Sequence, residues 1–405
     1  MAGTTGSATG TSAPNKNAVT AAQLIARARD MIPTVRERAE RAEKLRRLPP
    51  ETHQDFIDAG FYKVLQPTRY GGYGLDYGVN CEISTEIARG CASSGWIASI
   101  TTCHAWILGM MEVEAQERVW GNDEGQLIAS CFFVAEHKLE RATGGYRLSG
   151  RWRFSSGVDL CQWVLVQAVI PAEKGPPDRF FCLLPLAECK IEDVWHVTGL
   201  AATGSNDVVA RDVFLPDSHM LRVNDLNGGP TPGSAVNGEH IYKLPLFGVF
   251  SYNLVGTGTG AAIGAVDQLT DQMKARTTSG TRLKLATMQS VQLRLARASA
   301  EADAARTIVA RNLEEMNRVT REGNWPTMEQ RMRYRRDSSY ASLLAVQATE
   351  GVFPLVGGQG LTTDNAIGRA WRDAHAVQQH IALTWDAHGT GYGEWLLGVS
   401  PPGMG

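Results

Sequence analysis

The stretch that decides the fold is GGQGLTTDNAIGRAWRDAHAVQQHIALTWDAHG, residues 357–389 of a 405-residue chain. It joins a glycine-rich turn to a segment of helical character that carries Arg372, Asp373 and His380. His375 and His380 are five residues apart and would point roughly 140° apart on a helix, so they do not predict a shared metal ion. We predict no metal site anywhere in the chain.

Composition excludes several classes of partner. The 40 basic and 42 acidic side chains leave a net charge of -2, which gives no reason to expect nucleic acid or an anionic membrane surface. Seven cysteines without a CxxC pair are typical of reduced thiols in a cytoplasmic protein. No apolar run is long enough to span a bilayer, and residues 1–17 are predicted to be a disordered tail.

Hydrophobic periodicity divides the chain into three parts. Apolar residues recur at three and four from Val19 to Leu48, and helical stretches continue to about Trp120. Short apolar runs between Gly, Pro and Asp then predict strands, before a long helical stripe returns around Met288 to Met316. We predict an α domain at 18–124, a β domain at 125–223, a linker loop at 224–240 and a helical bundle at 241–405.

The turn and its helix resemble a known family. GGxG followed by RDA about a dozen residues later is similar to the C-terminal region of flavin enzymes with the acyl-CoA dehydrogenase fold. The resemblance implies an α+β, mostly α fold with an N-terminal α domain, a middle β-barrel-like domain and a C-terminal four-helix bundle. It also implies a homotetramer.

One residue separates this chain from the dehydrogenases it resembles. Those enzymes often carry a catalytic carboxylate about nine residues past the Arg of RDA, whereas residues 375–381 here contain no acid and place His380 there instead. The chain therefore resembles the oxygenase component of two-component monooxygenases. That resemblance implies FMNH2 or FADH2 from a separate NAD(P)H:flavin reductase, O2 as co-substrate, a C4a-hydroperoxyflavin and hydroxylation of a small phenolic or indolic substrate.

The segment LSGRWRFSSG is expected to hold the flavin ring. Strand alternation places Trp152, Phe154 and Ser156 on one face, and the resemblance gives Ser156 the hydroxyl that hydrogen-bonds flavin N5. Ser130 and Cys131 fall on the strand that passes beneath the flavin pyrimidine in such enzymes. The alternative for Ser156 is a serine that ends a strand, which the C-terminal signature makes the less favoured interpretation, and the other two could be core.

Five further residues are candidates for the phosphate or nucleotide end of the flavin. The resemblance assigns this role to Arg276 and Gln289 across a subunit interface, and glycine amides can also approach phosphate. A solvated arginine and a helix C-cap are the alternatives. The glycines of the turn that are expected to contribute are Gly357, Gly358 and Gly360.

Two histidines are the catalytic candidates beside Ser156. An imidazole with an ordinary pKa of about 6.5 can take a proton from a phenol or donate one to a peroxide, and this role is predicted for His380 on its helix. His104 is expected to face the substrate, although either ring could be a buried structural histidine. The remaining predicted substrate contacts are Trp106, Phe132, Ser205 and Asn206, with Trp96 and Phe133 as further aromatic candidates.

Three alternative functions stay open at this point. An acyl-CoA dehydrogenase would need a carboxylate base from elsewhere, such as Glu82 or Glu86. A monooxygenase of the same fold could act on sulfur or nitrogen, and a helical scaffold could have lost the cofactor. The glycine spacing at Gly256 and Gly258 fits a dinucleotide fingerprint, but helix packing explains it better.

Overall fold

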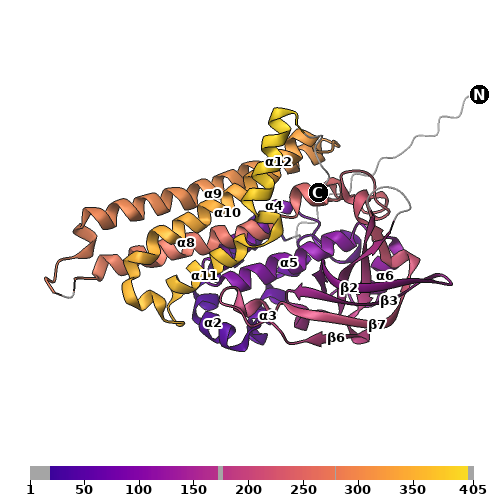
Figure 1. Cartoon of the computed structure of the whole chain (residues 1–405), viewed down its shortest axis with the longest axis horizontal. Coiled ribbons are helices and arrows are strands. Elements are labelled where there is room, and N and C mark those ends of the chain that lie inside the picture. Colours follow the sequence, from indigo (N-terminus) through magenta and orange to yellow (C-terminus); the bar gives the residue numbers. More distant parts are fainter. Residues whose placement is uncertain (1–18, 172–176, 279, 400–405) are drawn as a thin grey trace, which may run out of the picture.

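A computed structural model describes residues 19–171, 177–278 and 280–399, so the predicted tail at 1–17 lies outside the described residues. The strands lie at one end of the molecule, and the long C-terminal helices extend to the other (Figure 1). Within the described residues, no helix is long and apolar enough to cross a membrane. The first helices are α1 (Ala21–Asp30), α2 (Ile32–Leu45), α3 (Pro50–Ala59), α4 (Tyr77–Ala88), α5 (Ala92–Leu108) and α6 (Val113–Trp120).

The β region consists of two four-stranded sheets. One has the order β1 (Ile128–Cys131), β4 (Trp163–Ile170), β5 (Asp178–Pro185) and β8 (Met220–Arg222), and only its β1–β4 pair is parallel. The other has the order β2 (Phe133–Ala142), β3 (Gly145–Ser155), β7 (Asn206–Pro216) and β6 (Cys189–Glu192). Alternate residues of both sheets form a common core.

The C-terminal half is a bundle of long helices. Its helices are α7 (Leu246–Val249), α8 (Tyr252–Ala275), α9 (Gln289–Arg321), α10 (Met328–Val356), α11 (Ala366–Gln378) and α12 (Trp385–Leu397). Helices α8 to α11 pack on one another, and α8 also packs against α4 and α5. The result is α+β and mostly α, as predicted. The segment predicted as a loop at 224–240 contains short 3-10 helices, including η8 (Gly233–Ala235), and the buried Asn237 donates from Nδ2 to Gly109 O at 2.6 Å.

Glycines let α8 lie close to α4. A Cβ at Gly260 would lie 2.2 Å from Thr85 O, and one at Gly256 would lie 2.7 Å from Cys81 O. These contacts leave no room for a side chain. The dinucleotide-like glycine spacing is therefore a helix-packing feature, as the sequence interpretation favoured.

Glu86, which could have served a dehydrogenase as its base, is instead structural. Its side chain is fully buried and ion-paired with Arg29 at 3.1 Å, Arg89 at 2.7 Å and Arg306 at 2.8 Å. Burial raises the pKa of this carboxyl, but hydrogen bonds from the arginines outweigh burial and lower it to about 2. Glu82 shares Arg306 at 2.7 Å. Both acids join α4 to the neighbouring helices.

We predict that Glu86→Gln lowers the free energy of unfolding by about 3 kcal/mol, because three arginines lose their buried counter-charge. The pKa of Glu86 in the folded protein lies below the ordinary value of 4.5. Stability from Glu86 is therefore complete above pH 4.5 and is lost as the pH falls toward 2. Urea unfolding at several pH values measures both effects. Glu40→Gln, in an exposed pair with Lys44, is the control that should change neither, and equal behaviour of the two variants would contradict the prediction.

Candidate active site

Strand β3 ends in an irregular backbone. Phe154 has a φ of 70°, and the β3–β7 register shifts between Trp152 and Ser155. Trp152 is fully buried between the sheets and donates from Nε1 to Gln167 O at 2.7 Å, whereas Phe154 is 46% exposed. The prediction that these rings share one face with Ser156 is wrong, because a left-handed residue and a bulge break the period of two.

Ser156 lies at the start of a chain of hydroxyl groups. Trp96 on α5 donates from Nε1 to Ser156 Oγ at 3.0 Å. Ser156 Oγ lies 2.8 Å from Ser205 Oγ, which lies 2.7 Å from Thr203 Oγ1. Thr203 Oγ1 in turn donates to Leu200 O at 2.8 Å. Ser205, predicted to contact a substrate, is thus a link between buried hydroxyls.

Asp373, the aspartate of the RDA motif, holds the loop in which the chain of hydroxyl groups ends. Leu200 N donates to Asp373 Oδ1 at 2.6 Å. A Cβ at Gly199 would lie 2.4 Å from Arg372 O, so only glycine lets this loop approach α11 so closely. Arg372 Nε also donates to Thr198 O at 2.8 Å. Burial raises the pKa of Asp373 to about 7, which shows how completely the loop covers the carboxyl.

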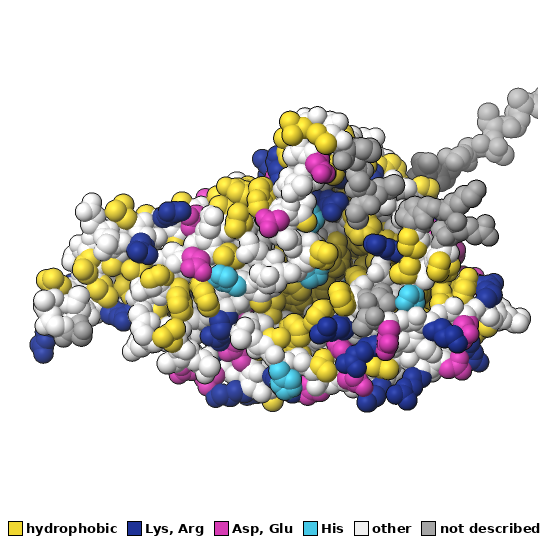
Figure 2. Space-filling view, viewed as in Figure 1, with side chains coloured by type: hydrophobic (Ala, Val, Ile, Leu, Met, Phe, Trp, Pro, Cys, Tyr) yellow, Lys and Arg dark blue, Asp and Glu magenta, His cyan; other side chains and the backbone are white. Residues whose placement is uncertain are grey.

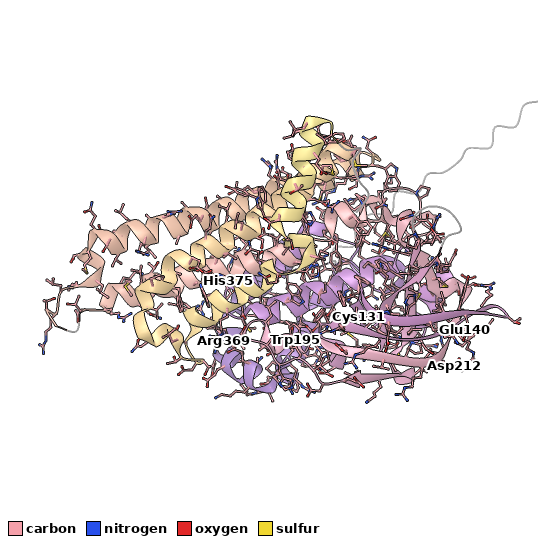
Figure 3. The ribbon with its side chains drawn as sticks, viewed as in Figure 1. Cys131, Glu140, Trp195, Asp212, Arg369 and His375 are labelled. Atoms are coloured by element: carbon pink, nitrogen blue, oxygen red, sulfur yellow. The ribbon has the colours of Figure 1, made fainter. Side chains whose placement is uncertain are left out.

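Asn206 has a comparable anchoring role. Its side-chain oxygen accepts from Val194 N at 3.1 Å and Trp195 N at 3.2 Å. The Trp195 ring lies 6.0 Å from that of Phe154, which lies 5.7 Å from the exposed ring of Phe133. In Figure 3, Trp195 lies at the end of the β region that faces the helices, whereas Glu140 and Asp212 lie at the opposite end.

His380 does not lie on a helix as predicted. Helix α11 ends at Gln378, and His380 is extended, with φ -68° and ψ 132°, as the N-cap of a short 3-10 helix, η12 (Ile381–Leu383). Its Nδ1 accepts from Ala382 N at 3.1 Å. A ring nitrogen that accepts carries no proton, so the proton of the neutral ring is on Nε2. Burial lowers the pKa of His380 to about 4.

His104 has the opposite tautomer. Its Nδ1 donates to Ile128 O at 2.8 Å, so the neutral ring has a free lone pair on Nε2. Ser130 Oγ lies 2.6 Å from Nε2 and donates to it. Burial lowers the pKa of His104 to about 4, so both histidines are neutral at physiological pH. Burial thus places the pKa of both rings below the unperturbed value of 6.5.

A line of aromatic rings connects the two histidines. Phe132 lies 6.5 Å from His104 and 6.1 Å from Phe250, and His380 lies 6.1 Å from Phe250 and 5.9 Å from Trp96. Trp96 and His104 are eight residues apart on α5, which spans about 12 Å of helix. The rings therefore come from α5, from the residue after β1, from the connection of α7 to α8 and from the segment after α11. Figure 2 shows a hollow lined by hydrophobic side chains between the strands and the helical bundle.

The sequence did not identify two aromatic residues of this region, one in the line and one beside it. Phe181 on β5 stacks on Phe132 at 4.2 Å, and Phe250 lies between α7 and α8. Each lies in an ordinary apolar segment near another aromatic residue, Phe180 or Phe247, so no local signal distinguished it. Trp106 differs from its prediction, because its ring is fully buried, its Nε1 donates to Ile241 O at 2.9 Å, and its ring packs on Tyr77.

The remaining cofactor candidates lie in two other places. Cys131 packs in the core between the two sheets, where its thiol is buried, and burial raises its pKa. Arg276 and the exposed Gln289 flank the connection between α8 and α9, at the end of the bundle remote from the strands (Figure 1). Arg276 donates to Leu355 O at 3.3 Å and Val356 O at 3.1 Å, directly before the glycine turn.

The turn itself needs glycine. Gly357 has φ 71° and ψ -156°, a backbone conformation available almost only to glycine, and Gly358 has open space around it. Gly360 is buried, and a Cβ at Gly368 on α11 would lie 2.3 Å from Gly360 O. The glycines therefore shape the turn and let α11 pack closely, while Gly357 and Gly358 leave their backbone accessible.

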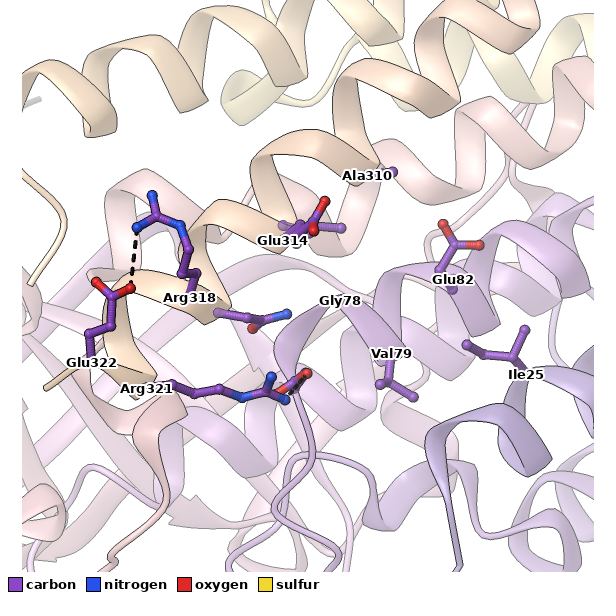
Figure 4. A pocket seen from close by; sticks show the side chains of 12 residues that line it. Ile25, Gly78, Val79, Glu82, Ala310, Glu314, Arg318, Arg321 and Glu322 are labelled. Atoms are coloured by element: carbon purple, nitrogen blue, oxygen red, sulfur yellow. Dashed lines mark hydrogen bonds and ion pairs between the residues drawn. The ribbon is translucent and has the colours of Figure 1, made fainter. Parts of the chain in front are cut away.

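A separate groove of about 620 Å³ lies between α1, α4 and α9 (Figure 4). None of the residues predicted for the flavin or the phenol lines it, although Glu82, the alternative dehydrogenase base, does. Its walls carry ion pairs, including Arg318 with Glu322 at 3.3 Å and the pair of Arg321 with Asp76. Such a charged lining does not suit an aromatic ring system, so the region of Ser156, His104 and His380 remains the candidate site.

Comparison with known proteins identifies the family. Residues 20–123 match the acyl-CoA dehydrogenase N-terminal domain, and residues 253–385 match the acyl-CoA dehydrogenase C-terminal domain. The chain is 36% identical over 393 residues to the oxygenase component of the FADH2-dependent resorcinol hydroxylase of Rhizobium sp. (strain MTP-10005), with 94% of this chain and 96% of that protein covered.

Two solved structures have the same fold. The 3-HSA hydroxylase from Rhodococcus sp. RHA1 has a TM-score of 0.88 and 31% identity, over 94% of this chain and 97% of that one. The HsaA monooxygenase from M. tuberculosis has a TM-score of 0.88 and 32% identity, over 95% of this chain and 99% of that one. The predicted fold and family are confirmed.

The histidine geometry makes a direct prediction for NMR. Both rings should stay neutral as the pH falls from 8 through the ordinary histidine value of 6.5, with the proton on Nδ1 in His104 and on Nε2 in His380. Nitrogen shifts of labelled histidine report charge and tautomer, and the His104→Gln and His380→Gln variants assign the signals. A midpoint near 6.5 for either ring would contradict the account. Because the unfolded chain binds these protons first, stability should decrease as the pH falls from 6.5 toward 4.

Proposed function

This chain belongs to the acyl-CoA dehydrogenase family and is an oxygenase component of its flavin-dependent monooxygenases, and from that premise we propose how its residues hydroxylate a phenol. The line of rings from His104 to Trp96 is the single observation that carries the proposal. It joins the His104–Ser130 pair at one end to the Trp96–Ser156 pair at the other, with His380 next to Trp96. The flavin belongs at the Ser156 end and the phenol at the His104 end.

The Ser156 end fits a reduced flavin. Ser156 is buried, and after its bonds to Trp96 and Ser205 its oxygen keeps one lone pair for a donor such as flavin N5–H. The half-exposed ring of Phe154 supplies an apolar surface beside it. Reduced FMN or FAD, when bound, supplies the electrons that activate O2. The apolar surroundings exclude the water that would release the activated oxygen as peroxide.

The His104 end fits a phenolic hydroxyl. Ser130 donates its proton to His104 Nε2, so the serine oxygen retains lone pairs that can accept a phenol O–H. As the phenol proton moves to Ser130 Oγ, the serine proton moves to His104 Nε2. Electron density then rises on the carbons of the phenol ring that lie beside the phenolic oxygen. Those carbons are the ones that an electrophilic oxygen attacks. A sulfur or amine substrate would leave this pair without a function.

His380 acts as a donor in this scheme. Its Nε2 carries the proton of the neutral ring, so it can donate a hydrogen bond to the oxygen being transferred or released. Removal of a phenolic proton by His380 would need the other tautomer. Of the two roles expected from the sequence, we therefore propose the donor role.

A second copy of the chain completes the site in our proposal. Arg276 and Gln289 lie at the end of the bundle remote from Ser156, so they reach only a flavin held by another copy (Figure 1). The accessible Gly357 and Gly358 lie beside Arg276. We propose a homotetramer in which these groups bind the phosphate or nucleotide of a neighbour's flavin. The reduced flavin comes from a separate reductase, for which we propose NAD(P)H as the electron source.

The function is tested by supplying a generic flavin reductase, NADH, FAD or FMN, O2 and a panel of phenols, indoles and organic sulfides. The expected result is a ring-hydroxylated product from phenols, identified by mass spectrometry. A dehydrogenase would instead reduce a dye with octanoyl-CoA and no NADH. Conversion of the sulfides alone would contradict the proposed roles of His104 and Ser130.

We predict that Ser130→Ala lowers the yield of hydroxylated product per NADH by about tenfold, because the phenol loses its acceptor. Hydrogen peroxide should rise by the missing amount. The control is Ser149→Ala, which removes a half-buried hydroxyl that accepts from the exposed Asp212 N at 2.8 Å. Unchanged coupling in Ser130→Ala would remove the serine from substrate activation.

His380→Ala should abolish product while peroxide release persists, because the hydrogen bond to the transferred oxygen is lost. His380→Gln keeps a side-chain N–H and should retain part of the coupling. Product and peroxide are measured in the same reactions. Equal coupling in the wild type and His380→Ala would exclude this role.

A further inference from the structure

The proton positions along the hydroxyl chain can be deduced from its buried end. Thr203 Oγ1 lies 2.8 Å from Leu200 O, and a carbonyl oxygen has no proton to give. Two oxygens at this distance attract only if a proton lies between them. Thr203 is therefore the donor, and its one proton is committed to Leu200 O.

The remaining protons follow in order. Since the Thr203 proton is used, Ser205 donates across the 2.7 Å contact to Thr203. Ser156 then donates across the 2.8 Å contact to Ser205, and Trp96 Nε1 donates to Ser156 at 3.0 Å. Ser156 is left with a lone pair and no proton to offer any further partner.

We propose that Trp96, Ser205 and Thr203 are positioning residues that fix Ser156 as a hydrogen-bond acceptor, so that the site selects reduced over oxidised flavin. Reduced flavin has a proton on N5 and can donate to Ser156. Oxidised flavin has only a lone pair on N5, which would face the lone pair of Ser156. The inference rests on the proposed placement of N5 at Ser156, and it gives Ser205 and Trp96 roles that need no contact with substrate.

Burial makes this arrangement selective. Ser205 is 3% exposed, Thr203 is 1% exposed and Ser156 is 9% exposed, so water has little access to repair a mismatch. An unsatisfied polar contact in such surroundings weakens binding by roughly tenfold to a hundredfold. Selection matters here because an oxygenase that retained oxidised flavin would block its next delivery from the reductase.

The acceptor at the end of the chain is held in place. Leu200 has a φ of 54°, and its N–H is bound by Asp373 at 2.6 Å. Its carbonyl also accepts from Trp195 Nε1 at 3.0 Å. The Leu200 carbonyl therefore cannot turn away without breaking these contacts, and the direction of the chain is built into the loop.

The test measures dissociation constants for oxidised flavin and for dithionite-reduced flavin under anaerobic conditions, with FAD and FMN as the probes. In Ser205→Ala the Ser156 proton loses its acceptor and becomes available to oxidised N5. We expect oxidised flavin to bind more tightly. The dissociation constant of oxidised flavin divided by that of reduced flavin should therefore fall about tenfold. Thr203→Val should shift the ratio in the same direction, because Ser205 can then donate to Ser156.

Ser155→Ala is the matched control. The Ser155 hydroxyl is also buried and adjacent in sequence, but it takes no part in the chain, so its removal should leave the ratio unchanged. Ser205→Thr, unlike Ser205→Ala, keeps a hydroxyl at this position and should keep the wild-type ratio. If Ser205→Ala does not fold, Thr203→Val decides the question.

An unchanged ratio in a folded Ser205→Ala or Thr203→Val protein overturns the inference while leaving the proposed function intact. A wild-type protein that binds neither form of flavin overturns the proposed function. A wild-type protein that binds both forms equally overturns the inference alone. The measurements need no substrate and no turnover.

Discussion

The hydrogen bond from Leu200 N to the buried carboxyl of Asp373 joins the loop before β7 to helix α11. Gly199 makes the approach possible, since any side chain there would strike the Arg372 carbonyl. Once this contact is made, the Leu200 carbonyl ends the hydroxyl chain that reaches Ser156. An acid in the RDA motif is thus linked, over 173 residues of sequence, to the hydroxyl group that we propose faces flavin N5.

The two histidines show how one side-chain type supplies both an acceptor and a donor. Burial keeps both rings neutral, and a backbone partner on Nδ1 decides which nitrogen carries the proton. His104 donates to a carbonyl and can therefore accept from Ser130. His380 accepts from an amide and can therefore donate. No carboxylate is required for these acceptor and donor roles. Glu86, the alternative acid, instead joins helices through its ion pairs.

Sequence patterns predicted the elements that depend on local periodicity. The helical stripes, the strand-rich middle and the glycine turn all follow from residue spacing. The RDA motif indicated the family. The failures are tertiary. Phe154 breaks strand alternation through one left-handed residue, and His380 falls just past the end of α11. The contact of Ser156 with Ser205 joins positions 49 residues apart, and no local pattern encodes such a contact.

The central claim concerns where the flavin lies and what it meets there. A crystal structure of the protein with dithionite-reduced flavin, grown and frozen without oxygen, tests it most directly. Our account predicts flavin N5 within about 3 Å of Ser156 Oγ, with the ring between Phe154 and His380. A flavin bound in the charged groove between α1, α4 and α9, or with N5 turned away from Ser156, would contradict it.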